Sequence, residues 1–188
     1  MNVCIGFEGN RRIALGNLSE VARKTKQVVD RGERGPVIIL DAVTSRVIEV
    51  DFRGTADDVV NRLKTKPSED EPIERKGPGR PKLGVVAREV TLLPRHWEWL
   101  NSQPGSASVV LRRLVEQARK DNSEKDRKRE AQESAYRFMS AMAGNAPGYE
   151  EALRALYSGK TKEFNQYIKT WPKDVQEHAR DLGLRGMG

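Results

Sequence analysis

Residues 105–115 read GSASVVLRRLV, a glycine turn followed by an amphipathic run. Ser106 stands where a helix cap is expected, since a serine oxygen can accept a hydrogen bond from the first free backbone N–H groups. The apolar residues behind it recur at i, i+1, i+4, i+5 and i+8, the spacing of a buried helical face. They are Val110, Leu111, Leu114, Val115 and Ala118, and the opposite face carries Arg112, Arg113 and Arg119.

A predicted strand and a shorter helix precede this run. The strand spans residues 88–93, and Pro94 is favoured as the first residue of the helix that follows. Residues 87–120 hold too little apolar surface to fold alone, so we expect a second copy to complete their core. The side chains expected in this shared core are Val90, Leu92, Trp97, Leu100, Val110, Leu111, Leu114 and Val115.

The turn and the second helix resemble the ribbon-helix-helix family of bacterial repressors and antitoxins. In that family the strands of two subunits pair antiparallel, and the ribbon enters the major groove of DNA, where base edges carry a full donor and acceptor code. The resemblance implies a homodimer with groove contacts from Arg88 and Thr91. It also implies a phosphate contact at the start of the second helix, from Ser106, Ala107 and Ser108. Plain capping of the helix is the alternative role of Ser106.

The strand fits that family less well than the second helix does. Family members usually carry a polar residue two positions before the proline, and this chain has Leu92 there. The strand can also face either way, because a shift of one residue exchanges its two faces. With Val90 and Leu92 turned inward it presents Thr91 to DNA, and the opposite register presents Arg88 instead.

Residues 77–82, GPGRPK, resemble the AT-hook, whose Gly-Arg-Pro core lies in the narrow minor groove of A·T-rich DNA. Pro81 holds the chain extended, and Gly79 allows close approach to the groove. The groove's negative potential attracts Arg80. The side chains expected to reach phosphates are Arg75, Lys76 and Lys82. The full hook has an arginine where Pro78 stands, and a basic linker without a binding role is the alternative.

The rest of the chain predicts two further parts around a linker at 64–86. Residues 1–63 predict a small ββαββα domain with helices behind the caps Asn17 and Thr55. Its predicted strands cover 3–7, 12–15, 37–40 and 46–52. Residues 121–188 predict a helical region with apolar stripes around Phe138, Leu156, Phe164 and Leu182. With the ribbon-helix-helix unit at 87–120, the expected fold is α+β and mainly helical.

Composition limits the class of partner. The 188 residues carry a formal net charge of +7, which favours a polyanion such as nucleic acid. The one cysteine, Cys4, lies in an apolar run and cannot form an internal disulfide, which fits a reducing compartment. No apolar run has the length of a membrane span, and no signal-peptide pattern is present. We therefore expect a cytoplasmic, nucleoid-associated protein without a membrane contact.

No sequence pattern predicts catalysis. The chain lacks a phosphate-binding loop in a strand-loop-helix setting, a nucleophile elbow and a His/Cys cluster. His96 and His178 are far apart in sequence and have no neighbouring ligands at metal-site spacing. We expect no enzyme activity, no cofactor and no metal.

The order of these pieces, including residues 84–97 and 136–144, looks like an uncharacterised bacterial family catalogued as domain of unknown function 2239. That resemblance covers nearly the full length and implies no activity. The function expected from the two DNA motifs is that of a dimeric, DNA-binding transcriptional regulator that prefers A·T-rich sites. One alternative is an antitoxin-like module that dimerises through residues 87–120 and binds a protein partner through the C-terminal helices. The other is a sequence-independent nucleoid protein.

Overall fold

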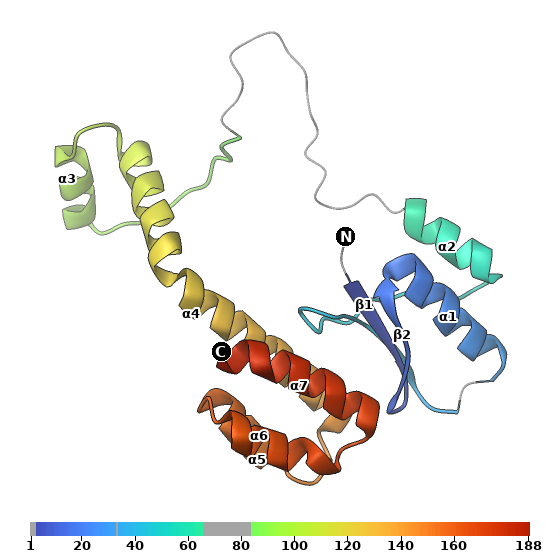
Figure 1. Cartoon of the computed structure of the whole chain (residues 1–188). Coiled ribbons are helices and arrows are strands. Elements are labelled where there is room, and N and C mark those ends of the chain that lie inside the picture. The colour runs from blue at the N-terminus through green and yellow to red at the C-terminus, as the bar shows by residue number, and fades with distance from the viewer. Residues whose placement is uncertain (1–2, 33, 66–83) are drawn as a thin grey trace. The chain divides into compact units, whose positions relative to one another are not determined.

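The computed structural model describes residues 3–32, 34–65 and 84–188. These residues form two compact units. Unit 1 combines the described residues up to 65 with those from 124 onward, and unit 2 holds residues 84–123. Seven α-helices and one three-stranded antiparallel sheet occupy the described residues (Figure 1).

The sheet of unit 1 has the strand order β2-β1-β3. Strands β1 (Val3–Glu8) and β2 (Arg11–Asn17) form the predicted hairpin, and Gly9 takes a positive φ of 53° in its turn. Strand β3 (Val37–Asp41) pairs antiparallel with the other side of β1. Helix α1 (Leu18–Asp30) begins at the predicted cap, where Asn17 Oδ1 accepts a hydrogen bond from the Glu20 N–H at 2.9 Å.

The predicted strand at 46–52 is wrong, so the first 65 residues follow a ββαβα order. Only an isolated bridge between Val47 and Leu40 remains of the expected pairing, supported by a 2.8 Å bond from the Ile48 N–H to the Ile39 carbonyl. The alternating apolar residues of this segment are nevertheless partly buried against the core. They are Ile48, Val50 and Phe52. The alternation of apolar residues therefore predicted correctly which side chains pack inward. The backbone hydrogen bonds to β3, however, end after Ile48.

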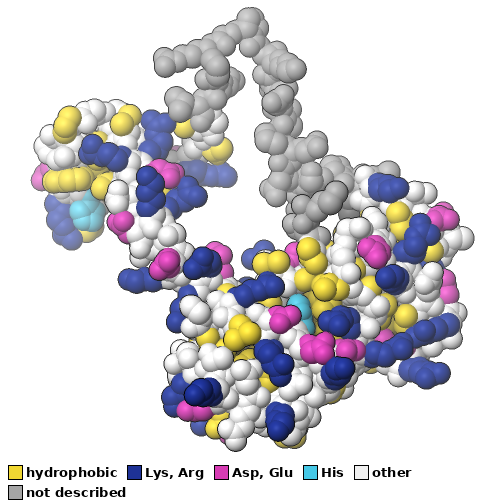
Figure 2. All heavy atoms as spheres, in the orientation of Figure 1, with side chains coloured by type: hydrophobic (Ala, Val, Ile, Leu, Met, Phe, Trp, Pro, Cys, Tyr) yellow, Lys and Arg dark blue, Asp and Glu magenta, His cyan; other side chains and the backbone are white. Residues whose placement is uncertain are grey.

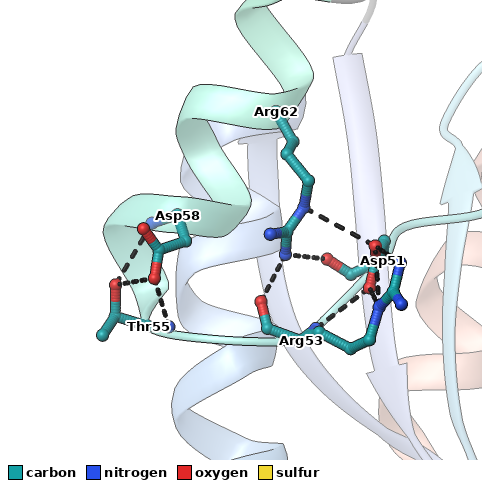
Figure 3. Close-up of polar contacts among 5 residues, drawn as sticks. All are labelled: Asp51, Arg53, Thr55, Asp58 and Arg62. Atoms are coloured by element: carbon teal, nitrogen blue, oxygen red, sulfur yellow. Dashed lines mark hydrogen bonds and ion pairs between the residues drawn. The ribbon is translucent and has the colours of Figure 1, made fainter.

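Polar contacts hold the end of this segment against α2 (Ala56–Thr65), as Figure 3 shows. The Arg62 guanidinium donates to the Asp51 carbonyl at 2.8 Å and also to the Arg53 carbonyl. Arg53 in turn donates to the Asp51 carboxylate at 2.7 Å, and its hydrogen bonds keep the Asp51 pKa well below the usual range. These contacts turn the chain away from the sheet edge, which explains why pairing stops.

The predicted cap of α2 is confirmed. The Asp58 N–H donates to Thr55 Oγ1 at 3.2 Å, while the Thr55 N–H donates to Asp58 Oδ2 at 2.8 Å (Figure 3). This reciprocal pair satisfies two backbone donors that the first turn leaves free. Hydrogen bonds from Thr55 also lower the pKa of the Asp58 carboxyl.

From Pro94 onward, helices are the only regular secondary structure among the described residues. After α3 (Pro94–Ser102), helix α4 runs over Ala107–Ala143 without a glycine or proline to interrupt it. Then follow α5 (Tyr149–Tyr157), α6 (Thr161–Tyr167), a 3-10 turn (Ile168–Thr170) and α7 (Lys173–Met187). The predicted apolar stripes are buried in unit 1 at Phe138, Leu156, Phe164 and Leu182.

The N-terminal sheet and the C-terminal helices share one core, in contrast to the separate parts 1–63 and 121–188 expected from sequence. The reason is the alternation of β1. Cys4 faces the cluster that α1 covers, while Ile5 and Phe7 face the C-terminal helices. A three-stranded sheet with one helix layer would leave that second apolar face in water. The Cys4 thiol is buried, as its place in an apolar run indicates.

Phe138 of α4 stands at the centre of this shared core. Its ring lies 5.7 Å from the Phe7 ring of β1 and 4.6 Å from the His178 ring of α7, centroid to centroid. A polar contact joins the neighbouring strand β2 to α7 at the rim, where the Arg12 N–H donates to Asp174 Oδ2 at 2.8 Å. Residues more than a hundred positions apart in sequence are thus packed together.

Replacing Phe138 by alanine should destabilise all of unit 1. We expect the free energy of unfolding to fall by about 3–5 kcal/mol, as large-to-small changes of buried aromatic residues do. Chemical denaturation measures the loss, and amide hydrogen exchange should accelerate in both β1 and α7. Tyr136→Ala removes a half-exposed aromatic residue from the same helix and should cost less than about 1 kcal/mol. Faster exchange in only one of the two segments would contradict a shared core.

Acid should destabilise the protein through His178. Burial lowers the pKa of this imidazole to about 4, with opposing effects from nearby Asp181 and from Arg185 and Arg12. The folded state therefore binds fewer protons than the unfolded state between about pH 4 and 6.5. Stability is fully present above that window and should drop by up to about 3 kcal/mol as the pH falls through it.

Thermal unfolding of the wild type and of His178→Leu across this window measures the effect. The variant should lose most of the slope in melting temperature against pH. Tyr136→Ala is the control, because it keeps His178, changes only a half-exposed side chain of the same unit and should retain the wild-type slope. An equal slope in wild type and His178→Leu would assign the acid sensitivity to other groups.

Candidate nucleic-acid interface

Unit 2 contains the two helices and the turn expected at 94–120. Pro94 occupies the first turn of α3, where its missing N–H costs no hydrogen bond. Gly105 takes a φ of 101° in the connection, a conformation that favours glycine. Helix α4 then begins, with the Ser106 carbonyl accepting from the N–H groups of Val109 and Val110 at 2.9 and 3.1 Å.

The predicted strand at 88–93 is not formed within one chain. A strand requires a neighbour for its N–H and C=O groups, and unit 2 offers none among the described residues. Thr91 and Arg88, the two expected groove contacts, both lie on this exposed extended segment.

Most of the predicted shared core is uncovered in the single chain. Leu100 and Val110 are buried, and Leu92 and Leu111 are partly buried. The other expected core side chains are exposed: Val90 (58%), Trp97 (38%), Leu114 (43%) and Val115 (55%). Leu93 and Trp99 add further exposed apolar surface. Figure 2 shows apolar side chains beside Lys and Arg side chains on the segment that holds α3 and the start of α4.

An apolar groove runs between the two helices of unit 2. Six residues of the extended segment, α3 and α4 line it: Leu92, His96, Trp99, Leu100, Leu111 and Leu114. Sequence reasoning assigned Leu92, Leu100, Leu111 and Leu114 to the shared core, and the groove adds His96 and Trp99 to them. Those two side chains reach the groove because α3 lies beside the start of α4.

Basic side chains surround this apolar surface. Between residues 84 and 123 the sequence has six Lys or Arg residues against four Asp or Glu residues, and all of these are exposed. Arg119 pairs with Glu116 at 3.0 Å, and Arg112 donates to its own helix at the Ser108 carbonyl. Arg88, Arg95 and Arg113 form no ion pair with the described residues, so their charge is available to a partner.

The start of α4 presents backbone donors to solvent. The N–H groups of Ser106, Ala107 and Ser108 donate to no acceptor within the described chain. The Ser106 hydroxyl also forms no hydrogen bond there, so the expected side-chain cap is not seen. Free donors at the positive end of a helix suit an anionic group.

The hook residues lie outside the described residues. They are Arg75, Lys76, Gly79, Arg80, Pro81 and Lys82. Among the residues that are described, no group of three or more His, Cys, Asp or Glu side chains could hold a metal ion. Within the same residues no helix combines the length and the apolarity needed to cross a membrane.

A family model described as "Uncharacterized protein conserved in bacteria (DUF2239)" matches residues 3–183. The match confirms the resemblance that residues 84–97 and 136–144 indicated. No curated protein and no solved structure matches the chain.

Proposed function

We propose that this chain, which belongs to the bacterial family DUF2239, is a DNA-binding homodimer that regulates transcription. The proposal rests on the chain's own residues, because the family description names no activity. The observation that carries the proposal is the exposed apolar surface of unit 2, flanked by unpaired arginines. Dimerisation would cover the apolar surface, and the phosphates of DNA would neutralise the arginines.

The dimer step follows from the balance of buried and exposed surface. Unit 2 buries few large apolar side chains, and the stripe that includes Leu114 and Val115 lies open on α4. A second copy of residues 84–123 would cover this stripe and supply the missing strand for residues 88–93. Both gaps in the single chain are filled by the same partner, which favours a twofold dimer.

The DNA step follows from charge and from free backbone donors. In the dimer, a paired ribbon would present two copies of Thr91 to the base edges, or two copies of Arg88 in the opposite register. The unsatisfied N–H groups at the start of α4 would contact a phosphate on either side. Arg80 of the hook would enter the adjacent minor groove and favour A·T-rich sites.

A protein-interaction module is the second candidate function, favoured by the apolar groove between α3 and α4. The C-terminal helices offer less surface for this purpose, since Phe138, Phe164 and Trp171 are buried. Tyr136 and Tyr157 remain partly exposed there and could contribute to a docking surface. Sequence-independent DNA binding is the variant of the first proposal in which the ribbon reads no bases.

Placing a charge in the proposed interface should dissociate the dimer. We expect Leu114→Glu to weaken dimerisation by more than tenfold, because the carboxylate would be buried without a partner. Sedimentation equilibrium at micromolar concentration measures the change. Ser123→Glu adds the same charge on the opposite, exposed face of α4, and should remain dimeric. A wild-type protein that is monomeric at these concentrations would overturn the dimer.

Removing two arginines should abolish tight DNA binding. Fluorescence anisotropy with A·T-rich and G·C-rich duplexes at two salt concentrations should show salt-sensitive binding that prefers A·T. Arg80→Ala with Arg88→Ala should bind more than about tenfold more weakly. The matched control is Arg23→Ala with Arg154→Ala, which removes the same charge from α1 and α5.

Each other outcome selects a different reading. Equal affinity for both duplexes would favour a sequence-independent nucleoid protein. An equal loss in the two double variants would show that net charge alone acts. Absence of binding at low salt would overturn the DNA proposal and leave the protein-interaction module.

A further inference from the structure

Five arginine side chains gather around an open cavity in unit 1. The cavity has a volume of about 810 Å³, within the ~300–1,000 Å³ range of small-molecule sites. Three separate segments form its wall: the loop after β3, the middle of α4 and the end of α7. The arginines are Arg46, Arg127, Arg129, Arg137 and Arg185.

The cavity keeps an excess of positive charge after its internal ion pairs are counted. Arg129 pairs with Asp126 at 2.9 Å, and Arg137 pairs with Glu133 at 3.3 Å. Arg46, Arg127 and Arg185 form no ion pair with the described residues. Glu130 and the terminal carboxylate of Gly188 are the remaining anionic groups on the wall, so three unpaired guanidinium groups face two carboxylates. An anion is the complementary occupant.

Apolar side chains lie between these charges. Leu182 is buried at the wall, while Val43 is 56% exposed and Leu184 is 45% exposed at the same cavity. An inorganic anion would neutralise the arginines and leave this apolar surface in water. A ligand with an apolar body would cover it and gain the free energy of its burial.

The loop that carries Arg46 is held in place before any ligand binds. Asp41 Oδ1 accepts hydrogen bonds from the N–H groups of Val43 at 3.0 Å and Thr44 at 2.7 Å. Ser45 takes a positive φ of 55°, and its hydroxyl is 2.9 Å from the Ser134 hydroxyl of α4. The Ser134 hydroxyl also donates to the Val43 carbonyl at 2.7 Å.

This anchoring has a consequence for binding. The loop is fastened to the same helix that carries Arg127 and Arg137, so the backbone of the wall needs little ordering when a ligand enters. A preorganised site loses less conformational entropy on binding than a flexible one. Guanidinium groups are suited to the task, since each can donate two parallel hydrogen bonds to a carboxylate or phosphate.

We propose that this cavity binds a small organic anion in which a carboxylate or phosphate is joined to an apolar body. The unpaired arginines recognise the charged group, and Val43, Leu182 and Leu184 contact the body. This site is independent of DNA binding by unit 2, and each proposal can fail without the other.

Calorimetric titration of the full chain with sodium octanoate and with octyl phosphate tests the site. We expect saturable binding of at least one probe with one site per chain. Arg127→Ala with Arg185→Ala should weaken it more than tenfold, because two charged contacts are lost. The charge-matched control, Arg23→Ala with Arg154→Ala, should stay within twofold of wild type.

A second variant guards against a change in folding. Leu184→Glu alters one half-exposed side chain and should also weaken binding, because it adds a negative charge beside the apolar body. Octanoate binding with weak octyl phosphate binding would identify the carboxylate as the recognised group, and the reverse would identify the phosphate. Inorganic phosphate that binds as tightly as either probe would overturn the apolar part of the proposal. Equal loss in both double variants, displacement of the probes by duplex DNA, or no binding of either probe would overturn the site.

Discussion

The packing of Phe138 between Phe7 and His178 is the contact on which the architecture of unit 1 depends. Strand β1 is apolar on both faces, and α1 covers only one of them. The other face can be buried only by residues that arrive more than a hundred positions later. Helix α4 supplies them, and α5 to α7 complete the same cluster. Two segments that read as separate parts in the sequence therefore form one structural unit.

Helix α4 consists of three parts that differ in polarity and burial. Its first turns expose an apolar stripe in unit 2, and its last turns bury Ala135, Phe138 and Met139 in unit 1. The charged stretch between them, from Arg119 to Glu130, is almost wholly exposed and remains helical because it lacks glycine and proline. The core is complete at one end of α4, while the apolar stripe at the other end is uncovered. This contrast supports the proposal of a partner for unit 2.

Two surfaces of different chemistry are left without an occupant in the described chain. One is the surface of unit 2, whose apolar part suits a second copy of the chain and whose arginines suit the phosphates of a nucleic acid. The other is the arginine-lined cavity of unit 1, which is concave and has the size of a small-molecule site.

Local patterns in the sequence determined most of the elements. The β1–β2 hairpin, the Asn17 and Thr55 caps, the proline-started α3 and the apolar stripes of the later helices were predicted because each depends on residues close together in the chain. Tertiary structure decided what depends on distant partners. Residues 46–52 left the sheet because Arg62 and Asp51 hold them against α2, and residues 88–93 lack a strand to pair with in a single chain. The cavity arginines come from three segments that only the shared core around Phe138 brings together, so no local pattern could have revealed them.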